Sequence, residues 1–185
     1  MNLDRFKKKT IYFDMDGVLV DLAKGLATLE GYDDPVLWFM HAQDENGALS
    51  FQRVIEKYIN EDVFVNLPPM PHFEEMKKLI YIMVKSGYNV KILSSCMDIE
   101  ISDIIASQKK SWIMEHLNGL VNYEDIHIVR GSKKKIEFIT DEDTFLIDDY
   151  TKTQKQFIEN GLGDQFILYI GFYSCMAELK TKNII

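Results

Sequence analysis

The sequence predicts an α/β fold in which helices flank a parallel sheet, and two observations carry this prediction. First, five short segments are apolar without clean alternation, as strands buried on both faces are. Second, segments with apolar residues at helical spacing lie between them, which favours parallel pairing through right-handed crossovers. The predicted strands are 10–15, 89–95, 126–130, 144–149 and 165–171.

The helices between these strands are predicted from the spacing of their apolar residues. In "HFEEMKKLIYIMVKSG", Phe73, Met76 and Ile80 recur at helical spacing, and Gly87 is a plausible stop. Further helices are expected at about 98–117, after Lys135, and at about 151–160.

The segment between the first strand and the first of these helices is too long for a simple crossover and contains no clear strand. Its best helix is "SFQRVIEKYI", "PVLWFMHA" is a second candidate, and the segment ends at the proline-rich "NLPPMP". We therefore expect a small helical cap inserted after the first strand. The predicted parts are a core, 1–21 and 68–185, and a cap, 22–67.

Composition excludes several classes of protein. A chain of 185 residues with 46% hydrophobic residues can form one globular domain with a substantial core. No apolar run approaches the roughly 20 residues that span a membrane, and the N-terminus lacks the apolar stretch of a signal peptide. Cys96 and Cys175 are far apart and form no disulfide framework, so we expect reduced thiols and a cytoplasmic protein without a membrane partner.

The net charge of −8 argues against a nucleic acid polymer as partner, because such a partner needs a basic face. It leaves room for a small anionic ligand, since a bound metal ion can reverse the local field.

Polar side chains follow four of the predicted strands. Because the carboxyl ends of parallel strands meet at one edge of a sheet, these side chains should lie together. Converging carboxylates would repel one another, and Mg²⁺, which prefers oxygen ligands, would offset that repulsion. Lysine and serine add positive charge and donors for phosphate oxygens, so the set fits phosphoryl transfer to an aspartate. The residues are Asp14 and Asp16, Ser94 and Ser95, Lys133 to Lys135, and Asp148 and Asp149.

These motifs resemble, in order, those of the haloacid dehalogenase-like (HAD) phosphohydrolase superfamily. "DMDGV" is similar to its first motif, "KILSS" to the second, and the lysine run and "FLIDD" to the third and fourth, over nearly the whole chain. Within it, "NLPPMPHFEEM", "ILSSCMD" and "LIDDYTK" resemble the 5′(3′)-deoxyribonucleotidase family and its bacterial and phage-type relatives. The resemblance implies a Rossmann-like (HAD-like) sheet with a cap. It also implies a Mg²⁺-dependent phosphomonoester hydrolase that acts on nucleoside monophosphates through an aspartyl-phosphate.

The resemblance implies roles for the acidic motifs. Asp14 is the nucleophile, and Asp16 is the general acid that then serves as base. Mg²⁺ is held by the Asp14 carboxylate, the Asp16 backbone carbonyl and the pair Asp148–Asp149; which member of that pair binds directly stays open. Gly17 allows the tight turn after the strand.

The resemblance also implies the phosphate contacts. Ser94 donates to a phosphoryl oxygen, and Ser95 is a second candidate. A lysine stabilises the transition state and orients the nucleophile. The residues that follow the run favour Lys135, whereas counting from Gly131 favours Lys133 or Lys134; we choose Lys135.

Trp38 and Phe39 lie in the predicted cap. One should pack in the cap's own core while the other lies over the site and stacks on a nucleobase, and Trp38 is our candidate for substrate binding.

Several other functions were considered. A calcium-binding loop is excluded, because two of the positions that should hold calcium ligands hold Val18 and Gly25. An aspartate-phosphorylated switch shares the acidic cluster, but its phosphoacceptor lies on a middle strand and it lacks a cap. A phosphatase for a sugar phosphate or other small metabolite, and a binding protein without turnover, are the remaining alternatives. The preference for 5′ or 3′ phosphates and the oligomeric state stay open, with a homodimer as one option.

Overall fold

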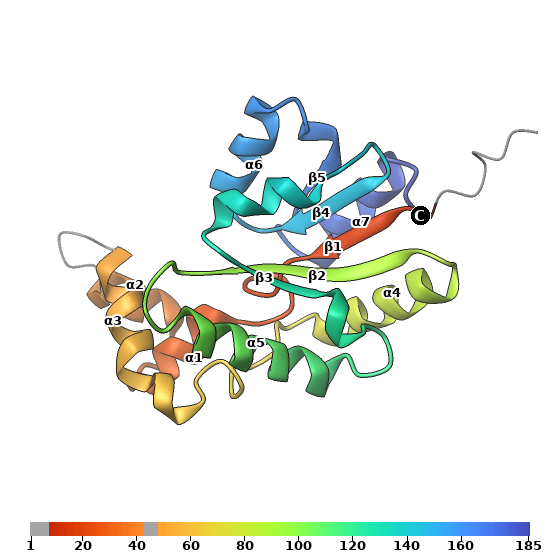
Figure 1. Cartoon of the computed structure of the whole chain (residues 1–185). Coiled ribbons are helices and arrows are strands. Elements are labelled where there is room, and N and C mark those ends of the chain that lie inside the picture. Colours follow the sequence, from red (N-terminus) through yellow and green to blue (C-terminus); the bar gives the residue numbers. More distant parts are fainter. Residues whose placement is uncertain (1–7, 43–47) are drawn as a thin grey trace, which may run out of the picture.

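The computed structural model describes residues 8–42 and 48–185 and contains a parallel sheet with helices on both faces (Figure 1). All four strand pairs are parallel, and the strand order is β3-β2-β1-β4-β5. The predicted fold class is therefore confirmed. The strands are β1 (Thr10–Phe13), β2 (Asn89–Cys96), β3 (Ile126–Arg130), β4 (Thr144–Asp148) and β5 (Phe166–Leu168).

The helices agree with most of the expected ones. Two α-helices, α1 and α7, were not predicted. The helix expected after Lys135 is wrong, because Lys135 itself lies within a 3₁₀ helix and the next element is a strand. The α-helices are α1 (Leu22–Leu29), α2 (Pro35–Ala42), α3 (Ala48–Tyr58), α4 (Phe73–Lys85), α5 (Ser102–His116), α6 (Thr151–Glu159) and α7 (Phe172–Thr181). The 3₁₀ helices are η2 (Ile59–Glu61), η3 (Tyr123–Asp125), η4 (Ser132–Phe138) and η5 (Gly163–Gln165).

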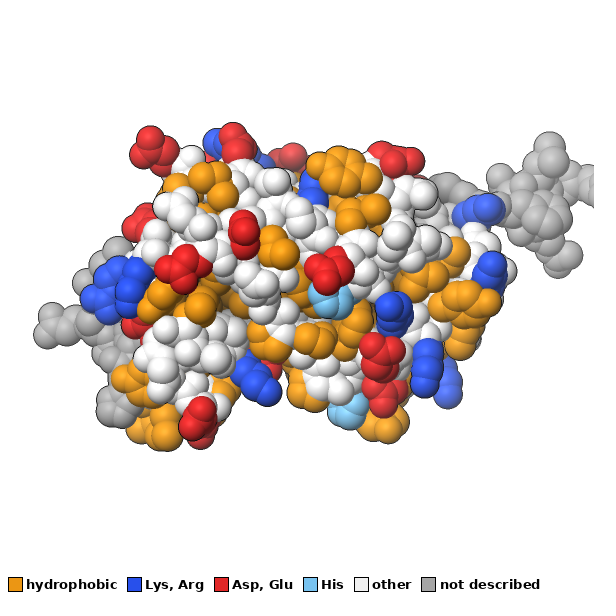
Figure 2. Space-filling model, turned by 90° about the horizontal axis from the view of Figure 1, so that it is seen from below, with side chains coloured by type: hydrophobic (Ala, Val, Ile, Leu, Met, Phe, Trp, Pro, Cys, Tyr) orange, Lys and Arg blue, Asp and Glu red, His pale blue; other side chains and the backbone are white. Residues whose placement is uncertain are grey.

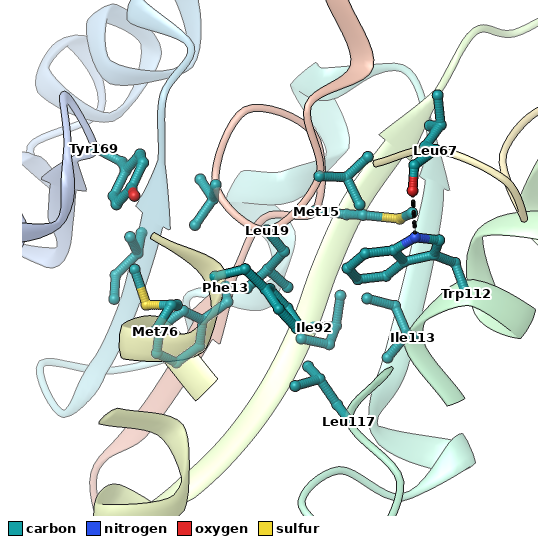
Figure 3. Packing of buried hydrophobic residues seen from close by; sticks show 14 of the residues in the cluster. Phe13, Met15, Leu19, Leu67, Met76, Ile92, Trp112, Ile113, Leu117 and Tyr169 are labelled. Atoms are coloured by element: carbon teal, nitrogen blue, oxygen red, sulfur yellow. Dashed lines mark hydrogen bonds between the residues drawn. The ribbon is translucent and has the colours of Figure 1, made fainter. Parts of the chain in front are cut away.

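Both faces of the sheet are buried, which explains why its strands lack alternation. On one face, Phe13 and Ile92 pack in the same core as Ile113 of α5 and Met76 of α4 (Figure 3). On the other face, Leu146 belongs to a second core with side chains of α6 and η4. None of the helices in the described ranges is long and apolar enough to cross a membrane.

The segment between β1 and α4 holds α1, α2, α3 and η2, and its described residues, 14–42 and 48–72, form no named strand. In Figure 1, α2 and α3 (orange) lie at the end toward which β1 and β2 run. The two connections of the segment lie side by side. Asp21 N donates to Pro68 O at 2.9 Å, and Met70 N donates to Leu19 O at 2.9 Å. The division into core and cap stays a prediction, and this pairing is compatible with it.

Side chains of α5 form hydrogen bonds with the backbone of the chain between α3 and α4. The Gln108 side chain accepts from Phe64 N at 3.1 Å and donates to Ile59 O at 2.7 Å. One turn further on, Trp112 Nε1 donates to Leu67 O at 2.9 Å, the dashed line in Figure 3. Since these groups are buried, each bond satisfies a backbone group that water cannot reach.

Replacing Trp112 with phenylalanine should lower the free energy of unfolding by about 1–3 kcal/mol, because the Leu67 carbonyl loses its donor while the aromatic packing is largely kept. Urea unfolding followed by circular dichroism measures this. The matched control is Tyr123→Phe at an exposed position, which should be neutral. Equal stability of Trp112→Phe and the parent protein would contradict a structural role for this bond.

Candidate active site

The sequence-predicted carboxylates meet where the strand order reverses. β2 and β3 lie on one side of β1, and β4 and β5 lie on the other. Phe13 pairs with Ile147, and Asp14 N donates to Ile147 O at 2.9 Å, so Asp14 and Asp148 leave adjacent strand ends side by side. This switch point is where open α/β sheets bind their ligands.

Lys135 lies between these two carboxylates. Its Nζ is 2.8 Å from Asp14 Oδ2 and 2.7 Å from Asp148 Oδ2, and the residue is 1% exposed. Burial alone would lower the pKa of Lys135, but the two carboxylates raise it above its usual value, so the ammonium form persists. The structure brings Lys135 into the site and leaves Lys133 and Lys134 exposed.

Asp14, Asp148 and Asp149 each offer a carboxylate oxygen, and these atoms lie within 4.8 Å of one another. Burial and the Asp14 charge raise the pKa of Asp148 to about 6. Asp149 is an exposed residue, but desolvation of its carboxyl group beside the cluster and the charges of Asp14 and Asp148 raise the pKa of that group to about 7. The carboxylates of the cluster thus repel one another when they are ionised. All of the ligand atoms that the cluster offers are oxygens, which Mg²⁺ prefers.

Gly17 makes the turn that brings the loop after β1 against this cluster. Its φ is +74°, and a Cβ at this position would lie 2.0 Å from Asp149 Oδ2. Any side chain here would displace the carboxylate, so glycine is required by both backbone conformation and space.

The two serines of β2 point to opposite faces of the sheet, since side chains alternate along a strand. Phe13 pairs with Ile92, so Ser95 lies on the side of Asp14, and it lines the cavity described below. Ser94 is fully buried on the α5 side, where its Oγ accepts from Lys109 at 3.2 Å. Of the two serines, Ser95 therefore lines the cavity and Ser94 does not.

Lys109 of α5 is a site residue that sequence reasoning missed. It is 1% exposed, forms an ion pair with Asp16 Oδ2, and donates to Ser95 O at 2.7 Å. Burial raises the pKa of Asp16, and the Lys109 charge opposes this rise. One signal could have identified Lys109: with Ile105 and Trp112 it lies on the apolar face of its helix, where a lysine needs a partner.

A cavity of about 820 Å³ opens above this cluster. Its polar end is formed by Asp14, Asp16, Ser95, Lys109, Lys135 and Asp149. Its other walls are mainly apolar, with Leu22, Phe39, Phe51, Ile55, Phe64 and Met70.

One of Trp38 and Phe39 is buried and the other faces the cavity, as expected, but the choice of Trp38 for substrate binding is wrong. Trp38 is 1% exposed and packs edge-on against Phe39 and Phe51, with ring centroids 5.8 and 5.0 Å apart. Phe39 is 41% exposed and lines the cavity. The side chain available for stacking is therefore Phe39.

Comparison with known proteins shows similarity at the level of fold. No protein-family model matches the sequence, and no curated protein matches it. A hydrolase from Streptococcus pneumoniae TIGR4 superposes with a TM-score of 0.54 at 13% identity, over 95% of this chain and all of that one. A candidate haloacid dehalogenase-like hydrolase from Burkholderia xenovorans LB400 gives a TM-score of 0.49 at 11% identity, over 92% of this chain and 86% of that one. The first similarity shows that the chain shares the fold of the streptococcal protein.

Asp149→Asn should stabilise the metal-free protein at high pH. A carboxyl group whose pKa rises from about 3.9 in the unfolded chain to about 7 in the folded protein binds protons more tightly when folded, so its contribution to stability falls as pH increases between these values. In EDTA, the melting temperature of the variant should exceed that of the parent at pH 8 and match it near pH 4.

Exposed Asp33 offers the control substitution, Asp33→Asn, which should show no such trend. Added Mg²⁺ should raise the melting temperature of the parent more than that of Asp149→Asn. A variant less stable than the parent at pH 8 in EDTA would mean that attraction, not repulsion, dominates at Asp149.

Proposed function

We propose that this protein is a Mg²⁺-dependent phosphomonoester hydrolase that works through an aspartyl-phosphate on Asp14. The observation that carries the proposal is the Lys135 ammonium between the Asp14 and Asp148 carboxylates, at the floor of a cavity that also holds Asp16. A carboxylate fixed by a buried cation, with a second carboxyl group two residues on, supplies a nucleophile and a proton donor. The streptococcal protein of the same fold is named as a hydrolase.

The reaction has two balanced steps. In the first, an Asp14 oxygen attacks phosphorus, the bond between phosphorus and the ester oxygen breaks, and that oxygen leaves with its electron pair and takes a proton from Asp16. In the second, a water oxygen attacks phosphorus and the water gives a proton to Asp16. The bond between phosphorus and the Asp14 oxygen breaks, its electron pair returns to Asp14, and inorganic phosphate leaves. The sum is ester plus water to alcohol plus phosphate.

Mg²⁺ would be held by the carboxylates of Asp14 and the pair Asp148–Asp149, with the backbone carbonyl of Asp16. When bound, it supplies the positive charge that lets a phosphate dianion approach several carboxylates. Lys135 stabilises the charge on the phosphoryl oxygens and orients Asp14, and Ser95 donates a hydrogen bond to a phosphoryl oxygen.

A nucleoside monophosphate, with a deoxyribose or ribose sugar, is the substrate that the cavity supports best. Phe39 of α2 and Phe51 of α3 line the cavity with aromatic surface. A flat nucleobase gains from stacking on aromatic rings, whereas the hydroxyls of a sugar phosphate need hydrogen-bonding walls. A sugar phosphate or other small metabolite is the second candidate.

A small molecule is the partner that the surface charge favours. On the face seen in Figure 2, the Lys and Arg side chains of the described residues are interspersed with Asp and Glu. A nucleic acid polymer would instead need a continuous basic strip on its binding face.

The direct test is hydrolysis of 4-nitrophenyl phosphate and a panel of deoxynucleoside monophosphates, ribonucleotides and sugar phosphates. We expect turnover that requires Mg²⁺, is abolished by EDTA, and falls at least 10³-fold in Asp14→Asn, which keeps the shape of the side chain but loses its nucleophile.

Three outcomes would overturn parts of this proposal. Equal turnover by Asp14→Asn excludes the nucleophile. A preference for sugar phosphates removes the nucleotidase assignment. A stable aspartyl-phosphate with negligible turnover indicates a switch instead of an enzyme.

Phe39→Ala should raise KM for the preferred nucleotide about 10-fold, because one aromatic stacking contact contributes about 1–3 kcal/mol. Its KM for methyl phosphate, which has no base, should stay within twofold of the parent value. Val36→Ala is the control, since Val36 is exposed on the same helix and does not line the cavity. Equal rises in KM for both substrates would exclude a stacking role.

A further inference from the structure

We propose that Lys109 is a positioning residue that holds the Asp16 carboxylate in the orientation for proton transfer. The inference rests on the proposed function and adds a residue to it. Lys109 enters from α5, on the face of the sheet opposite to η4, which carries Lys135.

The contacts of Lys109 separate this role from phosphate binding. A lysine ammonium has three donors and no acceptor. The Lys109 Nζ is in contact with Asp16 Oδ2, lies 2.7 Å from Ser95 O and 3.2 Å from Ser94 Oγ. All three donors are therefore used within the protein, and none is left for a phosphoryl oxygen.

The same contacts distinguish the two oxygens of Asp16. Oδ2 is held by Lys109, whereas Oδ1 is buried with no hydrogen-bond partner among the described residues. A buried carboxylate oxygen without a hydrogen-bond partner lowers the stability of the folded protein, and such atoms often have a functional role. Lys109 thus holds the carboxyl group through Oδ2 and leaves Oδ1 without a protein donor, which keeps the group oriented and able to carry the proton that passes to the leaving oxygen as the ester bond breaks.

The surroundings hold Lys109 rigidly. Its Nζ lies 5.3 Å from the centre of the Phe64 ring, which covers it with an aromatic face. The neighbouring Gln108 fixes the backbone of Phe64 to the same helix. Lys109 is thus anchored through the chain that returns from the predicted cap.

The decisive measurement compares leaving groups in Lys109→Met. 4-Nitrophenolate leaves without a proton, whereas an alkoxide requires one. We expect kcat/KM for an alkyl phosphate to fall at least 50-fold and kcat/KM for 4-nitrophenyl phosphate to fall less than fivefold. The inhibition constant of inorganic phosphate should stay within threefold of the parent value.

Lys109→Arg, which keeps the charge, should restore part of the lost kcat/KM for the alkyl phosphate. Lys110→Met is the matched control. Lys110 is the next residue of α5, lies over the Tyr123 ring at 4.5 Å, and should leave both substrates unaffected. Equal losses for the two leaving groups, with weaker phosphate inhibition, would show that Lys109 binds phosphate and overturn the proposal.

A second measurement does not depend on catalysis, so failure of the proposed function can be told apart from failure of this inference. Removing Lys109 alone leaves the Asp16 carboxylate without its cation. In EDTA at pH 8, the double variant Asp16→Asn/Lys109→Met should therefore melt at a higher temperature than Lys109→Met. A double variant that melts at or below the temperature of Lys109→Met would overturn the pairing whether or not the protein hydrolyses phosphate.

Discussion

The Lys135 ammonium between two carboxylates is the interaction on which the site depends. A buried charge is tolerated only when it is paired, and Lys135 has partners on two different strands, Asp14 after β1 and Asp148 at the end of β4. The parallel register of these strands, with Phe13 opposite Ile147, is what brings the two carboxylates to one ammonium group. A slip of one residue in β4 would turn Asp148 to the other face of the sheet and leave Lys135 unpaired on that side. The register of β1 and β4, which the packing of the whole core determines, is therefore required for the pairing of Lys135 with Asp14 and Asp148.

A second ammonium group, Lys109, meets the cluster from the opposite face of the sheet. Four carboxylates, those of Asp14, Asp16, Asp148 and Asp149, therefore face two buried lysines. When all four carboxylates are ionised, the remaining negative charge is the amount that one divalent cation would neutralise. The raised pKa values of Asp148 and Asp149 have this excess as one of their causes, beside burial. Each lysine holds one of the two carboxylates to which we assign chemistry, and a cation would meet the remaining charge at the acidic pair.

Much of the fold and part of the candidate site could be predicted from the sequence, because those features are local. An apolar run followed by Asp14 and Asp16 identifies a strand and its polar end together, and a parallel sheet then requires such ends to converge. Lys109 was missed because its meaning depends on burial: in "SQKKSW" it looks like the solvated Lys110 beside it. The choice between Ser94 and Ser95 depends on which face each occupies, and this follows only from the pairing of β2 with β1. Trp38 and Phe39 are neighbours on one short helix and both pack against Phe51 of α3, yet only Trp38 is covered, a difference that arises from tertiary packing.

In the function that we propose, substrate choice and chemistry would reside in different segments of this chain. The groups to which we assign chemistry are held by β1, β4, η4 and α5, whose positions follow from the sheet and its two cores. The aromatic wall of the cavity is supplied largely by α2 and α3, through Phe39 and Phe51, in the segment inserted between β1 and α4. The paired connections at Leu19–Met70 and Asp21–Pro68 join this segment to the core close to the loop that carries Asp14 and Asp16. Under the proposed function, we expect substitutions in α2 and α3 to reshape the wall that a leaving group meets without moving Asp14, Asp16 or the lysines, and so to change selectivity but not the reaction.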